Sequence, residues 1–226
     1  MSETLLTLSN PLVGERRPGS VGLPLPGVEA TVAQPDEHGI GELMVRGPSL
    51  FRGYWGRPEA SAAAWNEGWF STGDIAEADG ENYWYITGRK KELIVSSNGK
   101  KIYPSRIENL FKMEPLVNQV VLIGDKKPYM TAILTLNLAN LKGPKPAATA
   151  EQVKADPVTK AVEQAVARVN NQLADFERIR RFRILDRDFS IEHGELTPTM
   201  KIRRARVLDI HKDLVSQLYL GREESE

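Results

Sequence analysis

The chain has 226 residues, of which 41% are hydrophobic and 27% are charged, and this composition excludes collagen, coiled coil and intrinsic disorder. Lys and Arg together number 30, and so do Asp and Glu, which leaves no net charge to attract nucleic acid over a distance. We therefore expect no nucleic-acid partner. The absence of cysteine excludes a disulfide scaffold, a thiolate zinc site and a cysteine nucleophile.

Apolar stretches such as Val120–Ile123 are far shorter than the ~20 residues that a membrane-spanning helix needs. The first residues, Met1–Thr4, have neither the basic flank nor the apolar core of a signal peptide. We therefore expect a cytoplasmic protein without a transmembrane segment. The sequence leaves peripheral contact with a membrane and the oligomeric state open.

The first part of the chain is predicted to be rich in β-strands. Alternating polar and apolar residues at Val28–Val32 and Gly41–Arg46 predict short strands joined by turns. An Ala-rich run at Pro58–Trp65 predicts a short helix. Aromatic and β-branched residues at Tyr83–Thr87 favour a strand that runs directly into the charged segment Gly88–Lys91.

The residue pattern changes near Lys91, and we place a domain boundary there, between residues 1–90 and 91–226. A helix is expected to begin at Pro104, because proline suits the first turn of a helix. Two apolar runs around a turn-forming segment predict a hairpin at Val117–Asn137. The part that follows Lys91 is therefore expected to mix helices and strands.

The rest of the second part supplies helices and one strand, so we predict an α+β fold for it. Asp156 and Pro157 suit the start of a helix, and the apolar residues after them recur at helical spacing. The predicted segments are a Pro/Ala linker at Gly143–Ala150, an amphipathic helix from Asp156, a strand at Phe182–Leu185, and a closing helix that carries Val207, Ile210, Leu214 and Leu218.

Three sites combine residues that could carry chemistry. Asp74 follows Thr-Gly, and its carboxylate could accept two hydrogen bonds from a diol such as ribose, although capping a turn is the ordinary role of this short motif. Gly88–Glu92 could absorb a hinge rotation or serve as a solvated linker. Lys201 lies on a predicted loop and could reach a developing oxyanion or be an ordinary surface lysine.

Arginines cluster in two places in the second part. They form either a solvated face or a docking surface for a phosphorylated ligand or an acidic partner. The histidines lack the spacing of metal ligands, so we expect no metal site made of imidazoles. The arginines are Arg178, Arg180, Arg181 and Arg183, followed by Arg203, Arg204 and Arg206.

In chain order, these segments resemble the carboxyl-terminal third of the AMP-forming acyl-CoA synthetases, which belong to the adenylate-forming superfamily. Any one of the motifs can occur by chance, but the ordered set, separated by an α+β region of this size, is specific. The matching segments are Gly41–Leu43 with Gly53 and Tyr54, Ser71–Asp74, Gly88–Glu92 with Gly99 and with Ile107 and Glu108, and Pro198–Lys201.

The resemblance implies a role for each matching residue. Asp74 would bind the ribose hydroxyls, and Arg89 would support the ribose and phosphate of the nucleotide. Lys91 would be the hinge of the small domain, and Gly99 would lie against the pantetheine arm of coenzyme A. Lys201 would be the catalytic residue that bridges the carboxylate and the α-phosphate during adenylation.

The start of the chain is similar to the end of the family's Tyr-Gly-x-Thr-Glu motif, which implies that Ser2 contacts a phosphate and that Glu3 is the carboxylate on Mg²⁺. The family's Ser/Thr/Gly-rich phosphate loop has no counterpart in the 226 residues. We therefore expect a fragment that is inactive alone. It would comprise a β-rich, distorted barrel-like remnant of the large domain and a small, mobile α+β domain.

The finer resemblance, carried by Arg89–Val95 and Gly194–Lys201, is to the long-chain fatty-acid ligases. Acetate and aryl enzymes usually carry glycine immediately before the lysine, where this chain has Met200. The implied substrates are a fatty acid, ATP and coenzyme A, with Mg²⁺ as cofactor. The alternative is a non-catalytic module that docks an acidic partner, such as an acyl-carrier protein, on the arginines from Arg178 to Arg206.

Overall fold

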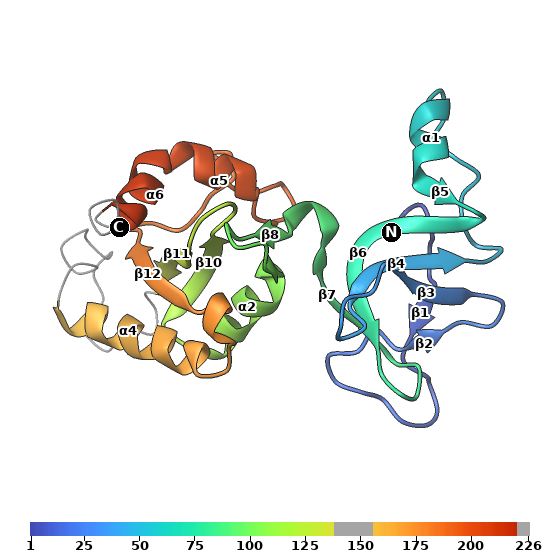
Figure 1. Ribbon diagram of the computed structural model, residues 1–226, viewed down its shortest axis with the longest axis horizontal. Helices are drawn as coiled ribbons and strands as arrows, with labels where there is room; N and C mark the ends of the chain where they lie inside the picture. The colour runs from blue at the N-terminus through green and yellow to red at the C-terminus, as the bar shows by residue number, and fades with distance from the viewer. Residues whose placement is uncertain (138–155, 221–226) are drawn as a thin grey trace. The chain divides into compact units, whose positions relative to one another are not determined.

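The computed structural model describes residues 1–137 and 156–220, and these residues belong to two compact units (Figure 1). The first unit is Met1–Leu93, and the second begins at Ile94. No helix within the described ranges is long and apolar enough to cross a membrane.

The first unit is built on a curled antiparallel sheet of five strands, in the order β3-β4-β6-β5, with β7 also paired to β6. Val45 and Phe70 are partners on β4 and β6 and are 0% and 1% exposed, so the core lies on their face of the sheet. Apolar residues that alternate along these strands project to that face. The elements are β1 (Leu8–Ser9), β2 (Leu23–Pro24), β3 (Glu29–Ala33), β4 (Gly41–Arg46), α1 (Pro58–Ala64), β5 (Trp65–Asn66), β6 (Trp69–Ala78), β7 (Trp84–Arg89) and the 3-10 helix η1 (Lys90–Glu92).

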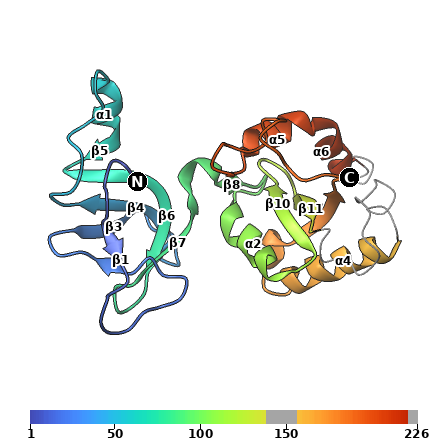
Figure 2. The ribbon, with the colours of Figure 1, turned by 180° about the vertical axis from the view of Figure 1, so that it is seen from behind.

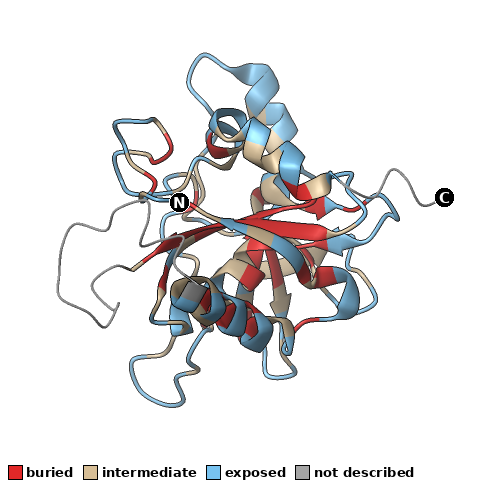
Figure 3. Ribbon diagram, turned by 90° about the vertical axis from the view of Figure 1, so that its left-hand side faces the viewer, coloured by how far each residue is buried: buried red, intermediate tan, exposed pale blue. Residues whose placement is uncertain are grey.

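The second unit has a three-stranded sheet in the order β10-β11-β12. β10 and β11 form the antiparallel hairpin that the sequence predicts, and β12 pairs in parallel with β11. Val120 and Leu122 face one apolar cluster, whereas Val121 and Ile123 face another, so both faces of the sheet are buried (Figure 3). The strands are β8 (Ile94–Val95), β9 (Lys101–Ile102), β10 (Val117–Ile123), β11 (Met130–Leu136) and β12 (Ile179–Ile184).

Helices cover both faces of this sheet (Figures 1 and 2). Ile107 of α2 and Val162 of α4 are fully buried against the face of Val120, and Val207 of α5 is buried against the face of Val121. This layered arrangement confirms the predicted α+β fold class. The helical elements are α2 (Pro104–Leu110), η2 (Phe111–Met113), α4 (Asp156–Asn170), η4 (Asp175–Glu177), α5 (Arg204–Ile210) and α6 (Lys212–Tyr219).

The prediction of a single closing helix is wrong, because the structure has two short helices, α5 and α6, that meet at His211. His211 has φ −102° and ψ 24°, away from helical values. The apolar periodicity continues across this break, since Val207 and Leu214 belong to the same apolar cluster. The predicted linker at Gly143–Ala150 lies outside the described residues.

Candidate active site

A bulge in β6 presents Asp74. The ladder between β4 and β6 changes register beside Thr72–Asp74, and Gly73 has φ +71°, a left-handed value that favours glycine. The buried Thr72 hydroxyl donates to the carbonyl of Leu43 at 2.8 Å and accepts from the N–H of Asp74 at 3.0 Å. These bonds hold Asp74 opposite Arg89 in the ladder with β7.

The Asp74 carboxylate is paired with Arg89. Arg89 Nε lies 2.8 Å from Asp74 Oδ1, and the aspartate side chain is 18% exposed. Burial raises the pKa of Asp74, and the Arg89 guanidinium opposes that shift. A carboxylate offers about four acceptor positions, so this single ion pair leaves Asp74 able to accept hydrogen bonds from a vicinal diol.

Glu42 holds the bulge to the segment that follows β7. Its carboxylate accepts from the N–H of Gly73 at 3.2 Å and from Lys90 Nζ at 2.6 Å, and its side chain is 12% exposed. Sequence reasoning places Glu42 in a family motif without giving it a role. The residue pattern gives no signal for such a role, because Glu42 occupies a polar position of the alternation in β4, on the face opposite to that of Leu43 and Val45.

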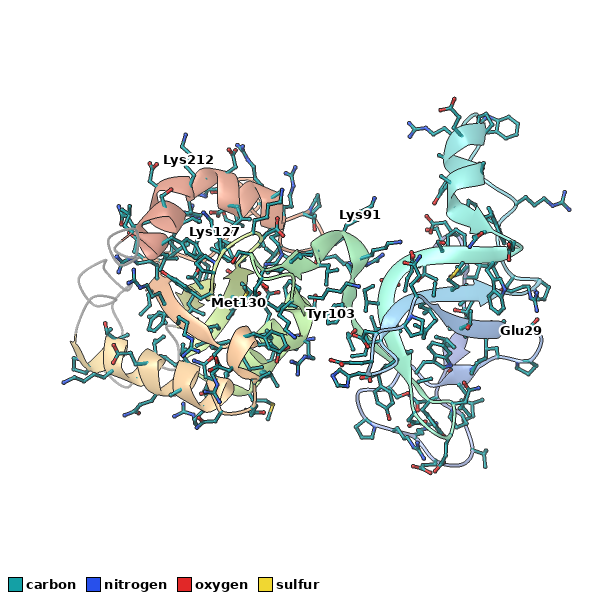
Figure 4. The ribbon with its side chains drawn as sticks, viewed as in Figure 1. Glu29, Lys91, Tyr103, Lys127, Met130 and Lys212 are labelled. Atoms are coloured by element: carbon teal, nitrogen blue, oxygen red, sulfur yellow. The ribbon has the colours of Figure 1, made fainter. Side chains whose placement is uncertain are left out.

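A cavity of about 830 Å³ in the first unit adjoins the bulge. It brings together three of the residues to which the resemblance assigns a role, namely Glu3, Arg89 and Lys91. Lys91 lies on η1, immediately after β7, and is exposed (Figure 4). The walls are Met1, Glu3, Glu42, Tyr54, Ala60, Ala63, Ala64, Phe70, Ser71, Thr72, Gly73, Arg89, Lys90, Lys91 and Glu92.

Glu3 is the carboxylate that the sequence predicts for a magnesium ion. Tyr54 Oη donates to Glu3 Oε1 at 3.4 Å, and burial, followed by the charge of Glu3, raises the pKa of Tyr54. In the part of the chain that the structure describes, no group of three or more His, Asp and Glu could hold a metal ion. A single carboxylate still fits Mg²⁺, because this ion commonly takes its remaining ligands from substrate phosphates and water. Ser2, the predicted phosphate contact, is exposed.

Lys201 lies on a short loop of the second unit that is closed by backbone bonds. Leu196 and Ile202 form an isolated antiparallel bridge, and the N–H of Thr197 donates to the Lys201 carbonyl at 2.8 Å. The N–H of Lys201 donates to Thr197 Oγ1 at 3.0 Å, and the lysine side chain is exposed. We name residues 196–202 the lysine loop.

Met200, just before the lysine, is in a left-handed conformation. Its φ is +61° and its side chain is 65% exposed. A residue with a Cβ is disfavoured in this region by roughly 1–2 kcal/mol relative to the right-handed helical region. The loop therefore requires at Met200 the backbone conformation that glycine, the residue usual at this place in the acetate and aryl enzymes, adopts without strain.

A second cavity, of about 480 Å³, lies in the second unit next to the turn that contains Gly99. Gly99 has φ +78°, and its N–H donates to the Ser96 carbonyl at 2.9 Å. Ser96 and Asn98 of this turn line the cavity together with basic and aromatic side chains. The cavity therefore combines the positive charge of its arginines with the exposed ring of Phe176. The other lining residues are Pro128, Tyr129, Asp175, Phe176, Arg178, Arg180 and Arg181.

The arginines of this cavity are only partly engaged by the protein. Arg180 pairs with Asp175 at 2.7 Å, and Arg178 approaches the same carboxylate at 3.5 Å. Among the described residues, the buried Nε of Arg178 has no hydrogen-bond partner. The predicted basic surface does not include Arg204, whose guanidinium donates to Glu108 at 2.7 and 2.8 Å and is mostly buried.

Comparison with known families identifies the chain. Residues 91–223 match the AMP-binding enzyme C-terminal domain, and residues 1–55 match the AMP-binding enzyme family. The chain therefore belongs to the AMP-binding enzymes. This finding confirms the resemblance to the AMP-forming acyl-CoA synthetases.

Curated relatives agree with this assignment. The chain is 37% identical to the long-chain-fatty-acid–CoA ligase FadD15 of Mycobacterium tuberculosis over 208 residues, which cover 89% of this chain and 34% of the relative. It is 36% identical to the long-chain-fatty-acid–CoA ligase ACSBG1 of Rattus norvegicus over 225 residues, which cover 88% of this chain and 31% of the relative. The chain thus spans about a third of the length of these relatives.

Solved structures share the fold. The crystal structure of ATP-bound MatB from Rhodopseudomonas palustris matches with a TM-score of 0.70 and 28% identity, over 95% of this chain and 40% of that chain. The adenylation domain of a carboxylate reductase from Mycobacterium chelonae matches with a TM-score of 0.69 and 23% identity, over 84% of this chain and 29% of that chain.

Proposed function

We propose that this chain is the carboxyl-terminal part of a cytoplasmic long-chain fatty-acid–CoA ligase. Such a ligase converts a fatty acid and ATP into acyl-adenylate and pyrophosphate, after which the thiol of coenzyme A displaces AMP. The observation that carries the proposal is the Asp74 carboxylate, held against Arg89 on a bulged strand in a chain that belongs to the AMP-binding enzymes. In this role Asp74 binds the ribose hydroxyls, and Arg89 supports the ribose and phosphate.

Lys201 supplies positive charge during adenylation. Its ammonium bridges the fatty-acid carboxylate and the α-phosphate, where negative charge develops. Lys91 is the proposed hinge between residues 1–90 and 91–226, and Ser2 and Glu3 serve the phosphates and Mg²⁺. In this proposal the chain alone does not form acyl-adenylate, because its 226 residues include no phosphate-binding loop to hold the triphosphate near Lys201.

The cavity beside Gly99 supports a place for coenzyme A. Gly99 would lie against the pantetheine arm, and Arg178, Arg180 and Arg181 would bind its phosphates, because guanidinium groups recognise phosphate through paired hydrogen bonds. The alternative, a non-catalytic module that docks an acidic partner such as an acyl-carrier protein, is supported by the same arginines. Arg204 would not contribute to such a docking surface, because its guanidinium is bound to Glu108.

The two half-reactions test these roles separately. In the ligase that contains this chain, Lys201→Ala should nearly abolish exchange of pyrophosphate into ATP, while transfer of supplied acyl-adenylate to coenzyme A keeps much of its rate. Equal loss in both half-reactions would contradict the role of Lys201. Arg180→Gln should raise KM for coenzyme A, and salt-dependent binding of an acyl-carrier protein without any adenylation would favour the docking module.

A further inference from the structure

Glu195 is a fully buried carboxylate at the base of the lysine loop. Its side chain is 0% exposed, and it accepts from the Arg187 guanidinium at 2.6 and 2.9 Å and from the Ser190 N–H at 3.1 Å. His211 Nε2 lies 2.8 Å from Glu195 Oε1. Burial acts to raise the pKa of Glu195, but the hydrogen bonds from Arg187 and His211 lower it to about 2. The carboxylate is therefore ionised at neutral pH.

The main chain of Glu195 closes the lysine loop. The N–H of Arg203 donates to the Glu195 carbonyl at 2.8 Å, and the bridge between Leu196 and Ile202 is the next pair along the loop. The two ends of the loop thus meet at Glu195. Its side chain reaches in addition the junction of α5 and α6, through His211, and the segment after β12, through Arg187.

Burial of the loop base does not require a charge. Leu196 and Val207 are 2% and 0% exposed and already belong to one apolar cluster with α5 and α6. A buried ion pair replaced by well-packed apolar residues often leaves stability unchanged or raised. The carboxylate adds a fixed orientation of the Glu195 side chain, because a bidentate contact with the planar Arg187 guanidinium holds both of its oxygens in place.

We propose that Glu195, oriented by Arg187 and His211, is a positioning residue that fixes the lysine loop so that Lys201 reaches the reacting atoms during adenylation. This proposal rests on the role proposed for Lys201. The lysine side chain has a flexible four-carbon stem and does not fix its own direction. The position of the loop backbone, set at the loop base, therefore determines which region its ammonium can reach. A misplacement of about 1 Å can lower a rate on the order of 100-fold.

The test compares Glu195→Gln, which keeps the shape of the side chain and removes its charge, with Glu114→Gln as a matched control. Glu114 accepts from Arg168 at 3.0 and 2.6 Å in the same unit. In hydrogen exchange on this chain, the Lys201 amide should exchange about 10-fold faster in Glu195→Gln, while the amides of β10 and β11 stay protected. In the ligase, kcat of adenylation should fall roughly 10- to 100-fold with little change in KM for ATP, and transfer from supplied acyl-adenylate should persist.

Unchanged exchange at Lys201 together with unchanged adenylation in Glu195→Gln would overturn the proposal. Faster exchange throughout the unit with equal loss in both half-reactions would also overturn it, because that result describes a residue that only stabilises the fold. If Glu195→Gln does not fold, Arg187→Lys keeps the charge, loses the bidentate geometry and provides the same readouts. The variant Lys201→Ala separates the two proposals. Intact adenylation in this variant would contradict the catalytic role proposed for Lys201, whereas hydrogen exchange in the lysine loop of Glu195→Gln still tests whether Glu195 fixes the loop.

Discussion

Asp74 and Arg89 face each other across the β6–β7 ladder, with Arg89 Nε 2.8 Å from Asp74 Oδ1. The aspartate comes from a bulge and the arginine from the last residue of its strand, directly before η1. Antiparallel pairing of two strands that follow each other in the chain is therefore enough to join the proposed ribose contact to the proposed phosphate contact. Both residues are fixed within a single folded unit.

Asp74→Asn should weaken nucleotide binding. The amide removes the negative charge and one acceptor while keeping the shape, and hydrogen bonds to charged groups contribute about 1.5–3 kcal/mol, so Kd for an acyl-adenylate analogue should rise roughly 10- to 100-fold. Isothermal titration of the ligase measures this change. Glu29→Gln is the control, because Glu29 lies on β3 of the same sheet (Figure 4) and pairs with the exposed Arg46 at 2.6 Å. An equal loss in the control would contradict the assignment.

Glu42→Ala should loosen the bulge. It removes the acceptor of the Gly73 N–H and the partner of Lys90, and an unpaired donor that is partly buried costs about 1–3 kcal/mol of unfolding free energy. Urea unfolding and hydrogen exchange at Gly73 measure the two effects. Glu42→Gln keeps an oxygen for Gly73 and should lose less stability. Unchanged exchange at Gly73 in both variants would show that Glu42 does not hold the bulge.

Glu195 should make the second unit sensitive to acid. Its pKa is about 2 in the folded chain, below the ordinary value of 4.5, so the unfolded chain binds more protons between these values. The stability that the ionised carboxylate contributes is complete above the ordinary value and is lost as the pH falls toward the folded value. Urea midpoints of the wild type and Glu195→Gln should therefore converge on acidification. A difference between the two urea midpoints that stays constant from pH 4.5 toward pH 2 would contradict the low pKa of Glu195.

Met200→Gly should relieve backbone strain in the lysine loop. Glycine adopts a φ of +61° without penalty, so stability should be unchanged or raised by up to about 1 kcal/mol. Met200→Val should lower stability by more than about 1 kcal/mol, because a β-branched side chain is poorly tolerated at positive φ. Thermal unfolding of the two variants gives the comparison. Equal stability of both would mean that the loop relaxes away from this conformation.

Local features of the fold follow from the sequence, whereas long-range pairings do not. Pro104 begins α2 and the β10–β11 hairpin forms as predicted, because first-turn prolines and turn residues act on their immediate neighbours. The parallel pairing of β12 with β11 joins segments far apart in the chain. The break at His211 coincides with its contact to Glu195, which residue periodicity does not register.

The candidate site divides in the same way. Motifs mark Asp74, Arg89 and Lys201, since each follows glycine, proline or threonine within three residues and the motifs come in a recognisable order. Glu42 and Glu195 gain their roles only through partners brought near by folding, and a lone glutamate in a sequence is ordinarily a solvated residue. Three-dimensional contacts are therefore needed to separate buried, paired carboxylates from the surface charges that surround them.

Two buried threonines distinguish one face of the three-stranded sheet of the second unit from the other. Thr131 and Thr135 of β11 are both 0% exposed, and their hydroxyls bond to Tyr219 at 3.0 Å and to Gln119 at 3.3 Å. Apolar residues cover both faces, so hydrophobicity alone distinguishes poorly between the native register and a slip by one residue. A slip would turn both hydroxyls toward α4 and away from these partners. If α6 were replaced by the corresponding helix of a relative, the new helix would therefore have to keep a tyrosine at position 219. Without it, Thr131 would lose the hydrogen bond that favours the native register of β11.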